Sequence, residues 1–145
     1  MYSYGRQFID QDDINAVIET LQGDWITQGP KVEEFEQGLK NEFGSEYCCA
    51  VANGTAALHL TALVLGWEPG DIVITSPITF LASANCILYV GGTPDFVDID
   101  PITYTIDPNQ VEEKIKAYQS NGKKIKAVIG VDYAGHPCDW EALRS

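Results

Sequence analysis

The residues best suited to chemistry surround a glycine that follows a short apolar run. Residues 51–57 read VANGTAA. The free N–H groups and positive dipole of a helix start bind anions, Gly54 permits close backbone approach, and Thr55 adds a hydroxyl donor. The same sequence also fits a glycine turn before a threonine-capped helix that needs no ligand. The pattern lacks the Gly-Lys-Ser/Thr of a P-loop and the G-x-G-x-x-G of a dinucleotide site.

A second candidate lies in residues 76–85, which read SPITFLASAN. A strand ends at Pro77, and Thr79-Phe80 opens a helix. An aromatic ring at the carboxyl edge of a parallel sheet can stack on a planar heteroaromatic ligand. The alternative is that Phe80 is a core residue and Thr79 only a helix cap.

The acidic and histidine residues favour structural roles. Asp98 and Asp100 are close enough in sequence to suggest acid–base or metal chemistry. However, their DxDP pattern is typical of turns, and Asp107 is placed to cap a helix that begins at Pro108. We expect His136 to lie in a surface loop and His59 to pack within a helix.

Composition narrows the class of protein. The chain has 145 residues and a formal net charge of −12, which disfavours nucleic acid and anionic membrane surfaces as partners. It has no apolar run of the ~18 to 20 residues that a membrane span needs and no signal-peptide pattern at its start, so we expect a cytoplasmic protein. The four cysteines lack C-x-x-C spacing, which argues against zinc, and we expect buried thiols, with no metal site: Cys48, Cys49, Cys86 and Cys138.

Helical and strand patterns alternate along the chain. We expect helices over residues 12–22, 31–43, 55–65, 79–89, 108–119 and from 138 onward. We expect strands over residues 47–51, 71–75, 95–99 and 126–133. This alternation predicts an α/β fold with a mostly parallel sheet. The last helix has no stop signal, which suggests that the chain is part of a longer protein.

Taken together, three stretches resemble one family along nearly the whole chain. They are NGTAALHL, then ITSPITFLASANCILYVGGTPDFVDIDPITYTIDP, then KAVIGVDYAGHPCD. They are similar to the DegT/DnrJ/StrS family of sugar aminotransferases, which depend on pyridoxal 5'-phosphate (PLP). The resemblance implies that residues 1–145 form the N-terminal portion of the PLP-binding large domain of a fold type I aminotransferase, an α/β/α fold. That portion would end before the lysine that forms the Schiff base.

The resemblance also implies roles for individual residues. By similarity, Gly54, Thr55 and Ala56 would hold the PLP phosphate, and Phe80 would stack on the pyridine ring. The sugar-nucleotide pocket would be lined by Tyr4, Asp24, Trp25, Ile26 and Thr27, with Thr55 at its border. No lysine present matches the catalytic one, because all of them fall on helix faces, in turns or at a strand start: Lys31, Lys40, Lys114, Lys116, Lys123, Lys124 and Lys126.

Within the family, the Asp132-Tyr-Ala-Gly stretch is similar to PseC-type enzymes. Those enzymes aminate a UDP-linked 4-keto-6-deoxy-N-acetylhexosamine in the pseudaminic acid pathway. This likeness implies glutamate as amino donor and a homodimeric full-length protein. Two alternatives stay open: another nucleotide-sugar aminotransferase of the family, such as one acting at C3, or a non-enzymatic α/β module that binds a phosphorylated ligand.

Overall fold

The computed structural model describes residues 5–144, which fall into two compact units that divide between Ala50 and Val51. In the first unit, α1 (Gln11–Gln22) begins at Asp10 with a capping box shared with Asp13. Helix α2 (Pro30–Phe43) has its proline in the first turn and ends at Gly44, whose φ of 61° suits glycine. Both helices were predicted from their apolar spacing.

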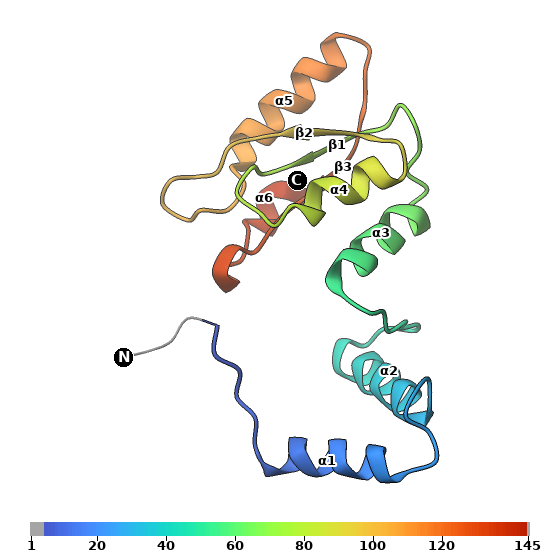
Figure 1. Cartoon of the computed structure of the whole chain (residues 1–145). Coiled ribbons are helices and arrows are strands. Elements are labelled where there is room, and N and C mark those ends of the chain that lie inside the picture. Colours follow the sequence, from blue (N-terminus) through green and yellow to red (C-terminus); the bar gives the residue numbers. More distant parts are fainter. Residues whose placement is uncertain (1–4, 145) are drawn as a thin grey trace. The chain divides into compact units, whose positions relative to one another are not determined.

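The second unit contains a parallel three-stranded sheet (Figure 1). Its strands are β1 (Ile72–Thr75), β2 (Thr93–Phe96) and β3 (Ile125–Ile129), in the order β2-β1-β3. The central strand pairs Ile72 with Thr93 on one side, and Val73 with Ala127 on the other. The predicted parallel α/β sheet is therefore confirmed.

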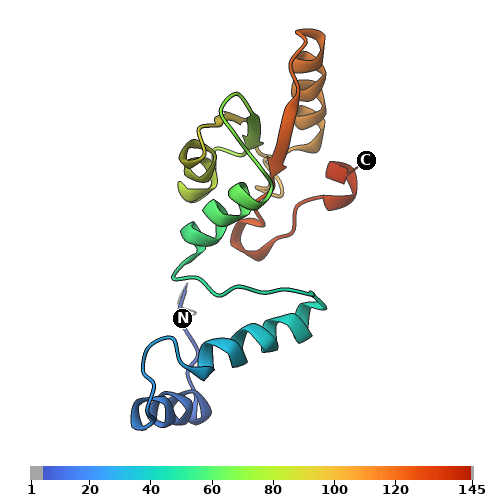
Figure 2. The same cartoon turned by 90° about the vertical axis from the view of Figure 1, so that its right-hand side faces the viewer.

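Helices cover both faces of this sheet. They are α3 (Gly54–Val64), α4 (Ala82–Tyr89), α5 (Pro108–Ser120) and α6 (Trp140–Arg144), with a 3-10 turn at Tyr133–Gly135. Helices α3 and α4 pack together, as do α5 and α6. Figure 2 shows α4 and α5 on opposite sides of the sheet.

Two hydrophobic clusters, one on each face, hold the layers together. Val73 and Ile74 are both fully buried because neighbouring residues of β1 point to opposite faces and each face is covered. The α3–α4 side contains Ala62, Trp67, Val73, Cys86 and Ile87. The α5–α6 side contains Ile74, Val97, Ile106, Val111 and Cys138.

The structure corrects several predicted boundaries. Residues 47–51, expected to form a strand, are irregular, because the strand prediction rested on apolar content and none of the described strands pairs with them. The helix expected over 79–89 begins only at Ala82. The strand expected over 95–99 starts at Thr93 and ends at Phe96, and the one expected over 126–133 stops at Ile129.

The cysteine prediction is half right. All four thiols are free, and Cys86 and Cys138 are buried, whereas Cys48 is half-buried and Cys49 is exposed. Burial raises the pKa of the Cys86 and Cys138 thiols, so neither has the thiolate character of a nucleophile.

Candidate functional site

The topology brings strand ends and helix starts to one edge of the second unit. In a parallel sheet all strands end at the same edge, and α4 and α5 begin where β1 and β2 end (Figure 1). Helix α3 finishes shortly before β1 begins, so its first turn points toward that carboxyl edge. In open α/β sheets this edge is where ligands bind.

The first turn of α3 offers unused hydrogen-bond donors. The Asn53 side chain caps the helix by accepting the Ala56 N–H at 2.9 Å. Within the described residues, the N–H groups of Gly54 and Thr55 donate to no protein acceptor, and the half-buried Thr55 hydroxyl has no partner. A Cβ placed on Gly54 would meet nothing within 4 Å, so the space in front of this turn is open.

This geometry separates the two sequence interpretations of Thr55. A threonine cap would have consumed its hydroxyl in holding the helix start. Because Asn53 supplies the cap, the Thr55 hydroxyl and two amides stay available to an anion. The residues therefore fit a phosphate group. Ala56 fits less directly, since its N–H is already bonded to Asn53.

Hydroxyl groups shape the loop that presents Phe80. Thr75 Oγ1 donates to the Ile129 carbonyl at 3.1 Å, which ties the end of β1 to β3. Ser76 Oγ donates to the Ile78 carbonyl at 3.3 Å. With its backbone so held, Phe80 keeps 76% of its surface exposed, and it is not the core residue of the alternative interpretation.

A second hydroxyl pair fixes the start of α4. The Thr79 and Ser83 side-chain oxygens lie 2.8 Å apart, and Ser83 is 93% buried, with 7% of its surface exposed. The Ser83 N–H also donates to the Phe80 carbonyl at 3.0 Å. Thr79 is therefore not the helix N-cap, which falls at Leu81, but it holds the loop next to Phe80. Sequence reasoning missed Ser83, whose only signal was its place four residues after Thr79.

Four of the predicted substrate residues lie in the first unit, whereas Thr55 lies in the second. Tyr4 lies outside the described residues. Asp24, Trp25, Ile26 and Thr27 lie in the loop between α1 and α2, where Trp25 and Ile26 are 66% and 68% exposed. The loop folds tightly, because a Cβ on Gly29 would sit 2.6 Å from Trp25 Cβ.

The remaining acidic and histidine residues have the structural roles predicted for them. Asp100 Oδ1 accepts the amides of Ile102 and Thr103, and Asp107 caps α5. His136 is exposed, and the His59 ring contacts the Tyr89 ring at 5.2 Å. In the described part of the chain, His, Cys, Asp and Glu form no group of three that could hold a metal. Nor is any helix among residues 5–144 long and apolar enough to cross a membrane.

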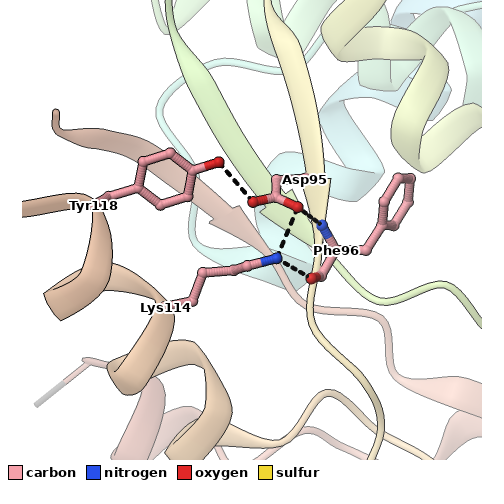
Figure 3. A network of polar contacts seen from close by, with 4 residues as sticks. All are labelled: Asp95, Phe96, Lys114 and Tyr118. Atoms are coloured by element: carbon pink, nitrogen blue, oxygen red, sulfur yellow. Dashed lines mark hydrogen bonds and ion pairs between the residues drawn. The ribbon is translucent and has the colours of Figure 1, made fainter. Parts of the chain in front are cut away.

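One polar network was not anticipated from the sequence (Figure 3). Lys114 Nζ and Tyr118 OH, from α5, each donate to the Asp95 carboxylate at 2.7 Å. Burial raises the pKa of that carboxyl, but the hydrogen bonds from Lys114, Tyr118 and the Phe96 amide, together with the Lys114 charge, hold it below its ordinary 3.8. The hydrogen bond to Asp95 raises the pKa of Tyr118.

Residues 7–145 match the DegT/DnrJ/EryC1/StrS aminotransferase family. The chain belongs to this family. One relative of the chain is the spore coat polysaccharide biosynthesis protein SpsC of Bacillus subtilis, 40% identical over 140 residues, which are 97% of this chain and 34% of SpsC.

Solved structures are similar to this chain as well. Helicobacter pylori PseC, an aminotransferase involved in the biosynthesis of pseudoaminic acid, matches with a TM-score of 0.86 at 30% identity, over 99% of this chain and 37% of PseC. NtdA from Bacillus subtilis, solved with bound cofactor PMP, matches with a TM-score of 0.79 at 31% identity, over 99% of this chain and 35% of NtdA. These likenesses confirm the fold type I expectation.

The chain spans about a third of the length of its curated relatives, 34% in each of two cases. Four of the described lysines make ion pairs with carboxylates of their own unit. Lys31 pairs with Glu34, Lys114 with Asp95, Lys116 with Glu112, and Lys126 with Asp71.

Proposed function

We propose that this aminotransferase chain supplies the phosphate anchor and ring-stacking surface of a PLP-dependent sugar aminotransferase. The observation that carries the proposal is the open first turn of α3, with two unpaired amides and the Thr55 hydroxyl. A second support is Phe80, an exposed aromatic in the loop that follows β1 and leads into α4. A third is NtdA, a relative solved with PMP.

Each of these residues would have a distinct task toward the cofactor. The amides of Gly54 and Thr55 and the Thr55 hydroxyl would donate to the phosphate, favoured by the helix dipole. Ala56 would border the phosphate, while its own amide stays with Asn53. The Phe80 ring would lie against the pyridine ring and exclude water from that face. Bound PLP itself supplies an electron sink for the transfer of an amino group.

We further propose a UDP-linked 4-keto-6-deoxy-N-acetylhexosamine as amino acceptor and glutamate as amino donor, in the pseudaminic acid pathway. The support is the likeness to PseC and the Asp132-Tyr-Ala-Gly stretch. By similarity, the sugar-nucleotide pocket would include Asp24, Trp25, Ile26 and Thr27 of the α1–α2 loop, and also Tyr4 and Thr55. The likeness to SpsC, a spore coat polysaccharide biosynthesis protein, supports the alternative that the substrate is a different nucleotide sugar.

Two parts of the proposal concern the whole protein. Residues 1–145 would be the N-terminal portion of the large domain, and the lysine that joins the cofactor would lie beyond residue 145. The whole protein would act as a homodimer. The acidic charge is compatible with this, since interfaces depend on local patches.

The phosphate anchor is tested by titrating the chain with PLP, with pyridoxal, and with inorganic phosphate. We expect PLP to bind more tightly than pyridoxal, because only PLP has the group that α3 would hold. Thr55→Val should weaken PLP binding by roughly three- to tenfold, the value of a hydrogen bond of about 1 kcal/mol. Thr61→Val is the matched control, because Thr61 lies in the same helix and its hydroxyl bonds only to the Ala57 carbonyl.

The outcomes separate the competing functions. Equal PLP affinity for Thr55→Val and the unaltered chain would refute the proposal that this helix start binds the phosphate. Phosphate binding without any preference for PLP over other phosphorylated ligands would favour the non-enzymatic module. For the whole protein, amination of the UDP-4-keto sugar with glutamate would support the full proposal, and amination of only other keto sugars would support the alternative substrate.

A further inference from the structure

The outer edge of β2 carries an unusual set of main-chain groups. Strand β2 pairs with β1 on one side, and no other described strand pairs with its second side. The amides of Thr93 and Val97 donate toward the β1 segment at 2.8 and 3.0 Å. Because main-chain groups alternate in direction along a strand, Pro94 and Phe96 present theirs to the outer side.

The outer side of β2 offers no free donor. Pro94 has no N–H. The Phe96 N–H donates to the neighbouring Asp95 Oδ1 at 2.7 Å. An incoming strand would therefore meet no unpaired amide along the length of β2.

The Phe96 carbonyl, an outward acceptor, is also occupied. Lys114 Nζ reaches from α5 and donates to this oxygen as well as to Asp95 (Figure 3). Tyr118 holds the second oxygen of the same carboxylate. The Lys114 and Asp95 side chains are only 30% and 26% exposed, so water competes weakly for the pair. We call Asp95, Lys114 and Tyr118 the edge clasp.

We propose that Pro94 and the edge clasp close the outer edge of β2 to strand addition by a second copy of the chain. Unpaired edges are templates for association, and proline and lysine are residues with which proteins block them. To pair there, a second strand would have to displace the Lys114 ammonium from Phe96. It would still find no donor at Pro94. Strand β3, with the sequence IKAVI, has no such proline.

The proposal is tested by opening the edge one group at a time. Pro94→Thr restores an outward N–H, Lys114→Met frees the Phe96 carbonyl while keeping a long side chain, and the double variant does both. Lys116→Met is the matched control, because it removes one positive charge from the same helix, where Lys116 pairs only with exposed Glu112. Circular dichroism and melting establish that each variant is folded.

The readout is hydrogen exchange of residues 93–96 at increasing protein concentration, together with sedimentation. For the unaltered chain and Lys116→Met, we expect exchange in this segment to be independent of concentration, even if the chain associates elsewhere. The folded double variant should show several-fold slower exchange there as concentration rises, and a larger sedimenting species.

Two results would overturn the proposal. One is concentration-dependent protection of residues 93–96 in the unaltered chain. The other is a folded variant with the edge opened and no added protection in that segment. If the double variant does not fold, the folded single variants Pro94→Thr and Lys114→Met decide by the same measurement: added protection of residues 93–96 in either one supports the proposal, and none in both overturns it. Association by other apolar surfaces does not mimic the result, since it does not protect this edge.

Discussion

Replacing Phe80 by alanine should separate cofactor binding from stability of the fold. Because 76% of the Phe80 side chain is exposed, truncating it should change the free energy of unfolding by no more than about 0.5 kcal/mol. If the ring stacks on the pyridine of PLP, its loss should weaken binding by about 0.5–1.5 kcal/mol, roughly 2- to 13-fold in Kd. A core phenylalanine would behave differently, since its truncation costs about 3–5 kcal/mol.

The assay is a PLP titration of the chain followed by its visible absorption and circular dichroism, with thermal melts of each variant. Phe80→Tyr keeps an aromatic ring and should retain most of the affinity. Phe43→Ala is the control, because Phe43 is equally exposed, at 75%, and has no proposed role toward the cofactor. Unchanged PLP affinity in Phe80→Ala would refute the stacking role. A melting temperature lowered by as much as truncation of a core phenylalanine lowers it would refute the exposed placement of the ring.

Three further expectations follow from other parts of the chain. The pKa of Asp95 is lowered in the folded chain, so this residue's contribution to stability is fully present above its ordinary pKa of 3.8 and is lost as pH falls through the lower folded-state pKa. Urea unfolding at several pH values should therefore show a smaller loss of unfolding free energy at acid pH in Asp95→Asn than in the unaltered chain. Gly130→Ala should destabilise by about 1–3 kcal/mol, because its Cβ would lie 2.6 Å from Trp140, whereas Gly38→Ala, with open space in α2, should stabilise by up to about 1 kcal/mol. The chain incubated with PLP, glutamate and a UDP-4-keto sugar should yield no amino sugar above a heat-treated control, and clear turnover would contradict the expected position of the catalytic lysine beyond residue 145.

Helices were easier to predict than strands because their signals are local. The cap at Asp10, the proline that opens α2 and the glycine at Gly44 all act within a turn of the helix they delimit. Strand ends depend on partners instead. Val97 and Ile99 continue an apolar pattern past Phe96, but β1 has already ended at Thr75, so strand pairing stops there. The same dependence on a partner strand explains why residues 47–51 do not form the predicted strand.

The candidate site was predictable in position but not in its hydrogen bonds. A glycine and a threonine at a helix start predict an anion site, and the strand-to-helix order places it at the carboxyl edge. Which side chain caps the helix is decided by one rotamer. Asn53 takes the Ala56 amide, and this leaves the Thr55 hydroxyl for a ligand. No residue count or spacing distinguishes that outcome from a threonine cap.

The edge clasp could be predicted from the sequence only in part. Lys114 and Tyr118 are four residues apart, which places them on one helix face, and this predicts that they can share a partner. That partner, Asp95, is 19 residues before Lys114, and it is chosen by the way α5 lies against β2. A lysine on an exposed helix ordinarily contributes little. This one acquires a role because the Phe96 carbonyl points away from β1 and accepts a hydrogen bond from the Lys114 ammonium, a circumstance created by the register of β2 on β1.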